Sequence, residues 1–293
     1  MSKFAPAIVK TEHLHTMSNL SNTTSDIHIE HPEYWTLLLE LCPGRLRYMF
    51  YDVDQDNSLI AGDIALDLSA GSYLKALENA VYDNPVLLDD YKQVRVIVDS
   101  MQFVVLPPAY DDETCALDAL DAAFPNREGD LVFCRLPRCQ VGIACDTPQG
   151  VTGFLQRTFN MPPVVHHLYP LCEHYRRQDD NREVACVHLN LNDGCADMLI
   201  TRNKQLVMAN SYPLKAADDA VYYALHAWKT FGLDQQRDEL LIAGDRDLTS
   251  AATATLRKYV SYVMPPIFPA QALKIGQDAM KAPLKLILLA LCE

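Results

Sequence analysis

Short apolar segments separated by turn-forming residues run through the first half of the chain and predict strands. Pro43-Gly44 and the polar run 54–57 divide the first three segments, and both are typical turn sequences. Helical spacing of apolar residues follows, with Ser72 as an expected N-cap. The expected strands are 35–41, 46–52, 59–66, 94–98, 103–106, 131–136 and 140–145. The expected helices are 72–81, 113–123 and 149–158.

The second half repeats this pattern, which indicates an internal duplication. Its most regular element is a helix over 216–230, with apolar residues on one face and Gly232 suited to its end. A second helix is expected over 249–259, and a helical tail closes the chain. The expected strands are 184–191, 197–201, 205–212, 240–243 and 262–267. Two successive runs of three strands, a helix, a strand and a helix predict an α/β protein with mixed sheets flanked by helices.

Proline and polar residues around 160–183 place the boundary between the two repeats. We therefore expect a flexible tail over 1–25, a first domain over 26–165 and a second over 166–293. The tail lacks the apolar core of a signal peptide, and no apolar run approaches the roughly 20 residues that span a bilayer. Nine cysteines without disulfide spacing fit buried free thiols in a reducing compartment, so we expect a cytoplasmic protein.

Charge and glycine content restrict the possible functions. The chain has 38 acidic and 25 basic residues, for a net charge of −13, which argues against a broad nucleic-acid surface and against an anionic membrane as partner. Only 11 of the 293 residues are glycine, whereas loops that hold phosphates use glycine so that backbone N–H groups approach closely. Little glycine remains for such loops.

The segment 187–213 carries a resemblance to a known fold. It reads His-Leu-Asn-Leu-Asn-Asp-Gly-Cys-Ala-Asp from His188, followed by Met-Leu-Ile-Thr-Arg-Asn-Lys-Gln-Leu-Val. Together with the duplication, it resembles the actin-like ATPases, and more closely an uncharacterised bacterial family of unknown function with that fold, related to division and pilus-assembly actin homologues. The resemblance covers about 30–293. It implies two ribonuclease-H-like domains, each with a mixed five-stranded sheet, and a nucleotide site between them.

The second phosphate loop of the family, Asp-x-Gly-x-Gly-Thr-Thr-Asp, maps onto the same segment. Its first Asp corresponds to Asn190, its first Gly to Asn192, its second Gly to Gly194 and its last Asp to Asp197. The threonine pair is replaced by Cys195-Ala196. This loop therefore keeps one glycine and one acid of the family pattern.

The other two nucleotide loops have diverged as well. The first phosphate loop, Asp-x-Gly-x-x-x-x-Lys, maps onto 40–47, with Glu40 in place of the Asp, Cys42 in place of the Gly and Arg47 in place of the Lys. The adenosine loop retains Gly244 but has an alanine before it, and Asp245 adds an anion. Side chains therefore stand where the family brings backbone against phosphate or adenosine.

These departures predict a non-catalytic pseudo-ATPase that acts as an interaction or scaffold protein. We expect no catalytic residues, no ATP or Mg²⁺ cofactor, and a protein partner. The alternative is a diverged nucleotide-binding ATPase or phosphotransferase that uses the same residues between the domains. The nucleotide-site candidates are Glu40, Arg47, Asn190, Asn192, Gly194, Asp197, Gly244 and Asp245.

A calcium loop is a separate hypothesis for 52–63. Asp52, Asp54, Asp56 and Asp63 occupy positions 1, 3, 5 and 12 of the EF-hand pattern, whose oxygen ligands wrap one ion. Position 6 is Asn57 where the pattern has glycine. A hairpin turn with solvated acids explains the same sequence, and we favour it.

Two further segments have a structural and a functional interpretation. His166, His167 and His174 with Cys172 form the densest set of metal-ligand types, but a strand-to-helix connection with surface histidines is favoured. The apolar stretch 283–291 has one lysine and no polar face, so we expect burial against its own domain, with a docking surface as the alternative.

Overall fold

The computed structural model describes residues 24, 27–110, 112–179, 182–192 and 194–292. The predicted tail over 1–25 lies outside these residues except for Thr24, which is buried. Among the residues described, none of the helices combines the length and apolar character that crossing a bilayer requires.

The first half of the chain builds a mixed five-stranded sheet. β1 pairs antiparallel with β2 and parallel with β4, and the strand order is β3-β2-β1-β4-β8. The tight turn at Pro43-Gly44 sets the β1–β2 register, in which Cys42 lies opposite Arg45. The strands are β1 (Thr36–Cys42), β2 (Arg45–Tyr51), β3 (Ile60–Ala65), β4 (Gln93–Val98) and β8 (Val164–His166).

The second half builds a sheet with the same topology. β9 pairs antiparallel with β10 and parallel with β12, in the order β11-β10-β9-β12-β13. The predicted pair of mixed five-stranded sheets is therefore confirmed. The strands are β9 (Cys186–Asn192), β10 (Cys195–Arg202), β11 (Gln205–Pro213), β12 (Glu239–Gly244) and β13 (Tyr262–Met264).

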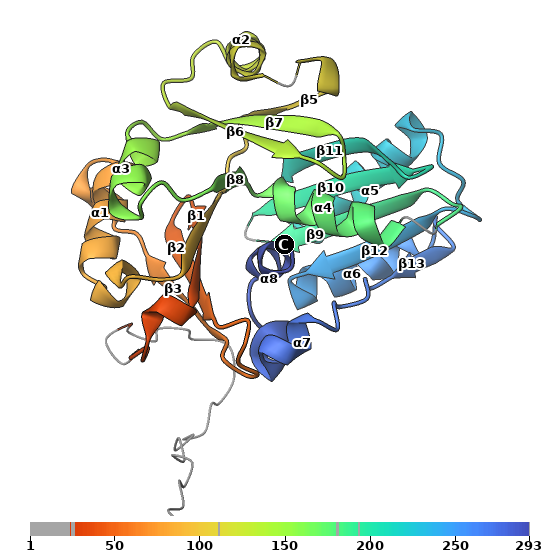
Figure 1. Cartoon of the computed structure of the whole chain (residues 1–293). Coiled ribbons are helices and arrows are strands. Elements are labelled where there is room, and N and C mark those ends of the chain that lie inside the picture. Colours follow the sequence, from red (N-terminus) through yellow and green to blue (C-terminus); the bar gives the residue numbers. More distant parts are fainter. Residues whose placement is uncertain (1–23, 25–26, 111, 180–181, 193, 293) are drawn as a thin grey trace, which may run out of the picture.

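A third, smaller sheet distinguishes the first half from the second. Its antiparallel strands β5 (Phe103–Leu106), β6 (Asp130–Leu136) and β7 (Val141–Thr147) have the order β5-β7-β6. Helix α2 (Glu113–Ala123) covers it, with Ala116 packed on Ala144 and Leu106. Figure 1 shows this unit above the two large sheets. It is inserted between β4 and the next helix of the first half, α3 (Val151–Thr158).

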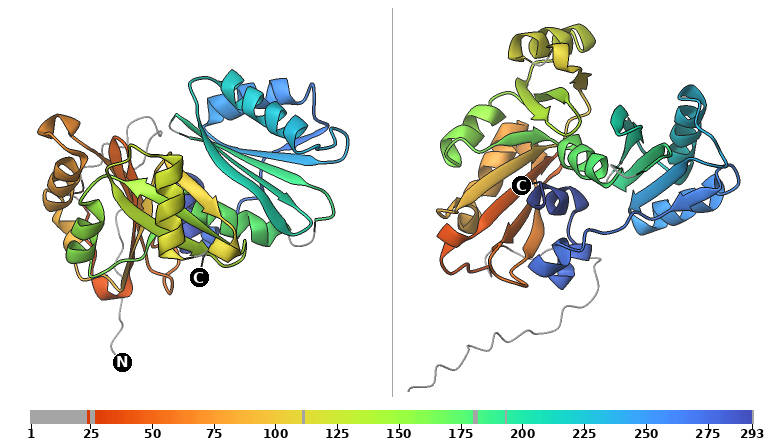
Figure 2. Two further views of the ribbon diagram at one scale, coloured as in Figure 1. Left: turned by 90° about the horizontal axis from the view of Figure 1, so that it is seen from above. Right: turned by 45° about the vertical axis from the view of Figure 1, so that its right-hand side comes forward.

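Each large sheet has one face covered by two helices. In the first half these are α1 (Tyr73–Tyr82) and α3, and in the second α5 (Ala217–Thr230) and α6 (Arg246–Leu256). The helix pairs lie on the outer sides of the molecule (Figure 2). Ser72 caps α1 as predicted, since its side chain accepts a hydrogen bond from Lys75 N at 3.1 Å.

Helices α4 and α8 lie between the two sheets. α4 (Leu168–Gln178) packs on β10 and on the small sheet: Leu171 of α4 lies in one apolar cluster with Leu199 of β10 and Leu136 of β6. α8 (Leu284–Ala290) lies in the centre of Figure 1, with α7 (Ala272–Ile275) at the edge of the first sheet. Short 3₁₀ turns occupy Pro32–Tyr34, Leu68–Ala70, Pro85–Leu88, Pro108–Tyr110 and Gln277–Met280.

The position of α8 corrects the expectation that the C-terminal stretch packs on its own domain. The stretch is buried, but against the first sheet: Leu286 and Leu289 pack with Leu38 and Ile97. The reason lies in β1, which is buried on both faces. Leu37, Leu39 and Leu41 face α1 and α3. Leu38 lies on the opposite face of the strand, where α7 and α8 supply the apolar cover.

Two predicted boundaries in the second half move for local reasons. α6 begins at Arg246 rather than 249, because Asp245 caps it by accepting hydrogen bonds from Asp247 N and Leu248 N, each at 3.0 Å. β13 ends at Met264 rather than 267, because Pro265 follows it and a proline contributes no N–H to a strand pair.

Candidate functional site

The two hairpins that the sequence maps onto phosphate loops occupy equivalent places in the two sheets. In the β1–β2 hairpin Glu40 lies opposite Arg47, and in the β9–β10 hairpin Asn190 lies opposite Asp197. Each pair is two positions in from the residue pair that closes the turn. Four of the eight predicted site residues therefore lie in matched positions of a duplicated structure.

Alternation along the strands turns these side chains toward the centre of the molecule. Glu40 follows Leu38 by two residues, and Leu38 faces α8. Asp197 precedes Leu199 by two residues, and Leu199 packs with Leu288 of α8. The polar positions of both sheets thus face the layer that contains α8.

Lys285 of α8 lies among the carboxylates of both halves. Its Nζ is 3.2 Å from Asp99 Oδ1 and 3.8 Å from Glu40 Oε1 in the first half, and 3.3 Å from Asp197 Oδ2 in the second. Its side chain is only 6% exposed. Arg47 adds a second cation, with Nη1 at 3.4 Å from Glu40 Oε2. Three acids and two bases therefore share one buried site, here called the Lys285 cluster.

The titration of this cluster follows from its charges. Burial alone would lower the pKa of Lys285, but Asp197, Asp99 and Glu40 outweigh it and hold the pKa well above its usual range. Burial alone would raise the pKa of Asp197, but Lys285 and His167 outweigh it and lower the pKa. Burial and the neighbouring Asp99 raise the pKa of Glu40, against Lys285 and Arg47. Lys285 and Asp197 are thus the two groups of the cluster whose charged forms are mutually stabilised.

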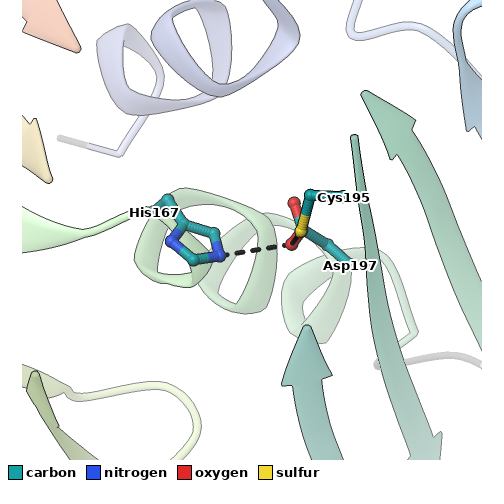
Figure 3. Close-up of side chains that lie close together, drawn as sticks. All are labelled: His167, Cys195 and Asp197. Carbon is teal, nitrogen blue, oxygen red and sulfur yellow. Dashed lines mark hydrogen bonds and ion pairs between the residues drawn. The ribbon is translucent and has the colours of Figure 1, made fainter. Parts of the chain in front are cut away.

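Hydrogen bonds hold the other oxygen of Asp197. Oδ1 accepts from Ser211 Oγ at 2.7 Å, lies 3.2 Å from His167 Nε2 and accepts from Cys195 Sγ at 3.2 Å. Figure 3 shows His167 pointing at Asp197 from the start of α4, with Cys195 beside the carboxylate. Because His167 Nδ1 accepts from Ser100 N at 3.3 Å, Nε2 carries the proton toward Asp197. Asp197 therefore contacts four protein groups.

Asp99 is a functional candidate that the sequence interpretation missed, and His167 is one that it named as a possible metal ligand but placed on the surface. Each directly follows a strand of the parallel part of the first sheet, Asp99 after β4 and His167 after β8. Carboxyl ends of parallel strands meet at one edge of a sheet, where ligand sites commonly lie. Two features of the sequence could have indicated this site. One is the polar residue that directly follows each apolar strand, and the other is the single lysine in the apolar stretch 283–291.

The favoured interpretation of His166 and His167 as surface side chains is wrong. The connection is strand-to-helix as expected, but the two histidines are 0% and 2% exposed, since the small sheet and α4 cover this edge. His166 Nε2 donates to Ser100 O at 3.0 Å, and burial first, then His167, keep the pKa of His166 well below its usual range. His166 is therefore neutral at pH 7.

The other predicted site residues lie around the cluster or apart from it. Asn190 is 1% exposed, and its amide atoms have no hydrogen-bond partner among the described residues. Asn192 and Gly194 lie at the tip of the β9–β10 hairpin, outside the Lys285 cluster. Gly244 and Asp245 are exposed at the end of β12, where a Cβ on Gly244 would lie 1.9 Å from Leu191 O. Gly244 therefore serves strand packing.

The loop with the calcium-like spacing joins two strands rather than two helices. Asp52 follows β2, and its Oδ1 accepts from Asp54 N at 2.9 Å, while Asn57 adopts φ 58°. Asp63 lies within β3, with a carboxylate oxygen 3.9 Å from Arg45. The backbone is that of a hairpin turn, and calcium binding stays a prediction.

Three groups of potential metal ligands occur among the described residues. Two of them, Glu40/Cys42/Asp99 and His167/Cys195/Asp197, flank Lys285. The third is Asp179/Cys186/His188 within the second half. There Asp179 already pairs with His188 at 2.7 Å and with Arg182 at 2.7 Å, and it accepts from Thr201. In each group a protein cation or donor already contacts the carboxylates.

Comparisons with known proteins agree with the fold. The family model described as "Protein of unknown function (DUF3822)" matches residues 24–263. A Bacteroides thetaiotaomicron protein with actin-like ATPase fold and unknown function has a similar structure, with a TM-score of 0.75 and 21% identity, covering 89% of this chain and 97% of that one. The PilM–PilN type IV pilus biogenesis complex contains a chain with a TM-score of 0.50 and 15% identity, covering 87% and 98%. No curated protein matches significantly.

Proposed function

This chain belongs to the DUF3822 family of proteins of unknown function, and we propose that it is a non-catalytic protein with an actin-like fold that serves as an interaction or scaffold protein. The observation that supports this proposal is Lys285. Its ammonium lies where Glu40, Asp99 and Asp197 converge, so an internal cation already contacts the acids that a magnesium nucleotide would face.

The same lysine joins the two halves. Glu40 and Asp99 belong to the first sheet region and Asp197 to the second, and Lys285 contacts all three. A nucleotide between two such domains contacts both of them. Here a covalently attached side chain makes the bridging contacts, so under this proposal the halves need no nucleotide to hold their arrangement. A fixed arrangement suits a protein that presents surfaces to others.

Protein partnership has a precedent in the fold. The PilM–PilN complex shows a protein of similar fold assembled with a partner protein. For this chain the partner stays a proposal, as do a cytoplasmic location and the absence of bound nucleotide.

The test is phosphate release by the full-length chain with ATP and Mg²⁺ or Mn²⁺. We expect no release above that of a matched Asp197→Asn preparation, because the carboxylates are engaged. The alternative, a diverged ATPase or phosphotransferase, requires metal-dependent release that D197N abolishes. That outcome would contradict the proposal, since it requires Lys285 to leave the acids during turnover.

A further inference from the structure

A second feature of the molecule lies on the outer surface of the second half, away from the Lys285 cluster. It is an open groove of about 400 Å³ between α6 and the segment that follows β13. The groove is lined by Ile242, Arg246, Thr249, Ser250, Thr253, Ala254, Arg257, Met264 and Pro265. This set is here called the α6 groove.

The polar side of the α6 groove is a stripe along one helix face. Arg246, Thr249, Thr253 and Arg257 follow one another at spacings of three or four residues, which places them on one side of α6. At 1.5 Å per residue the two arginines lie roughly 16 Å apart along the helix. The stripe therefore has a positive charge at each end and hydroxyl groups between.

The charge of the groove contrasts with that of the chain. The net charge is −13, yet the groove lining contains two arginines and no acid. Asp245 and Asp247 lie near Arg246 in sequence but do not line the groove, and Asp245 is engaged as the helix cap. The side chain of Arg246 has no hydrogen bond or ion pair within the described part of the chain and is available to a ligand.

The opposite side of the groove is apolar and partly exposed. Ile242 forms a buried floor, while Met264 is 37% exposed. Ile267, further along the same segment, is 79% exposed. Arg257 donates to Val263 O through Nη2 at 3.1 Å, which fixes the guanidinium at the edge strand. Apolar and cationic surfaces thus lie side by side.

We propose that the α6 groove binds an acidic, amphipathic segment of a partner protein. A phosphate or other small anion would gain nothing from Ile242 and Met264. It would also have to bring together Arg246 and Arg257, which are about 16 Å apart along the helix, although the Arg257 guanidinium is held at Val263 O. A peptide with carboxylates at both ends of an apolar stripe matches both surfaces. The inference rests on the proposed interaction role but not on Lys285.

The experiment measures fluorescence anisotropy of a labelled helical peptide with leucines on one face and flanking glutamates, titrated with the full-length chain. We expect saturable binding at low salt, weakened at least about fivefold by Arg246→Glu. The matched variant is Lys258→Glu, which reverses an exposed charge next to the groove and should leave binding unchanged. Unchanged thermal unfolding of R246E confirms that the variant is folded.

Several outcomes would overturn the inference. They are no saturable binding, equal binding by R246E, equal binding of a peptide with lysine in place of glutamate, or competition by inorganic phosphate or a short oligonucleotide at the groove. If the peptide fails while the chain still releases no phosphate from ATP, the groove assignment fails alone and the proposed function stands.

Discussion

Lys285 and Asp197 form an ion pair of 3.3 Å between Nζ and Oδ2 that joins the C-terminal helix to the second sheet, while that helix packs on the first. Both side chains are almost fully buried. A buried pair adds little net stability over an apolar pair of the same shape, but removal of one partner leaves an uncompensated charge. The pair therefore acts as a constraint on how the halves are arranged.

Replacement of the lysine should be costly. Lys285→Met leaves Glu40, Asp99 and Asp197 without their shared cation, and we expect the free energy of unfolding to fall by about 3–5 kcal/mol. Denaturant titration followed by circular dichroism measures the change. The control is Lys274→Met at an exposed site, expected within about 0.5 kcal/mol of the wild type. An equal effect of both variants would contradict the assigned role of Lys285.

The pH dependence should have opposite signs for the two acids. The pKa of Asp197 is lowered in the folded protein. Its contribution to the free energy of unfolding is therefore complete above the unfolded pKa of about 4 and is lost as the pH falls below that value. The pKa of Glu40 is raised, so its ionisation disfavours the folded state as the pH rises from about 4.

Stability curves of Asp197→Asn and Glu40→Gln against pH measure this difference. From pH 3 to 8, D197N should become more destabilised relative to the wild type and then level off, whereas E40Q should become less destabilised or turn stabilising. Parallel curves for the two variants would show that the charges of the cluster are assigned incorrectly.

Gly244 should tolerate no side chain. Its φ is +115° and a Cβ would lie 1.9 Å from Leu191 O, so Gly244→Ala is expected to cost about 3 kcal/mol or more. Gly44→Ala is the matched control, because nothing lies within 4 Å of its Cβ position. Thermal unfolding of the two variants compares them, and a tolerated G244A would refute the packing role of this glycine.

Asp245 should act as a helix cap. Asp245→Ala removes the acceptor of two N–H hydrogen bonds and should cost about 1 kcal/mol. Asp247→Ala, in the first turn but not the cap, should cost no more than about 0.5 kcal/mol. Denaturation midpoints distinguish the two. If D247A proved as costly as D245A, helix charge rather than capping would explain the effect.

The fold was predictable because its signals are local. Strand alternation, the turn at Pro43-Gly44 and the cap at Ser72 each depend on neighbours in sequence, and the duplication of three strands, helix and strand indicates the two sheets. The resemblance at Glu40, Arg47, Asn190 and Asp197 correctly located matched hairpins. The site was only half predictable for the opposite reason.

The contacts that the sequence did not predict are those between elements far apart in the chain. A lysine within an apolar stretch gives no indication of three carboxylates from other elements, and only the position of α8 on the first sheet brings Lys285 to them. His167 and Asp99 likewise depend on parallel strands ending at one edge. Such contacts arise from topology rather than from periodicity.

We propose that Lys285 takes the place of a metal–nucleotide ligand between the halves. The most direct measurement is calorimetric titration of the full-length wild-type chain with ATP in the presence of Mg²⁺, at a protein concentration of tens of micromolar, with ADP as a second titrant. We predict no heat beyond dilution, because the acids of both hairpins are already neutralised by Lys285 and Arg47. Saturable binding of Mg-ATP in the micromolar range, lost in D197N, would contradict the claim.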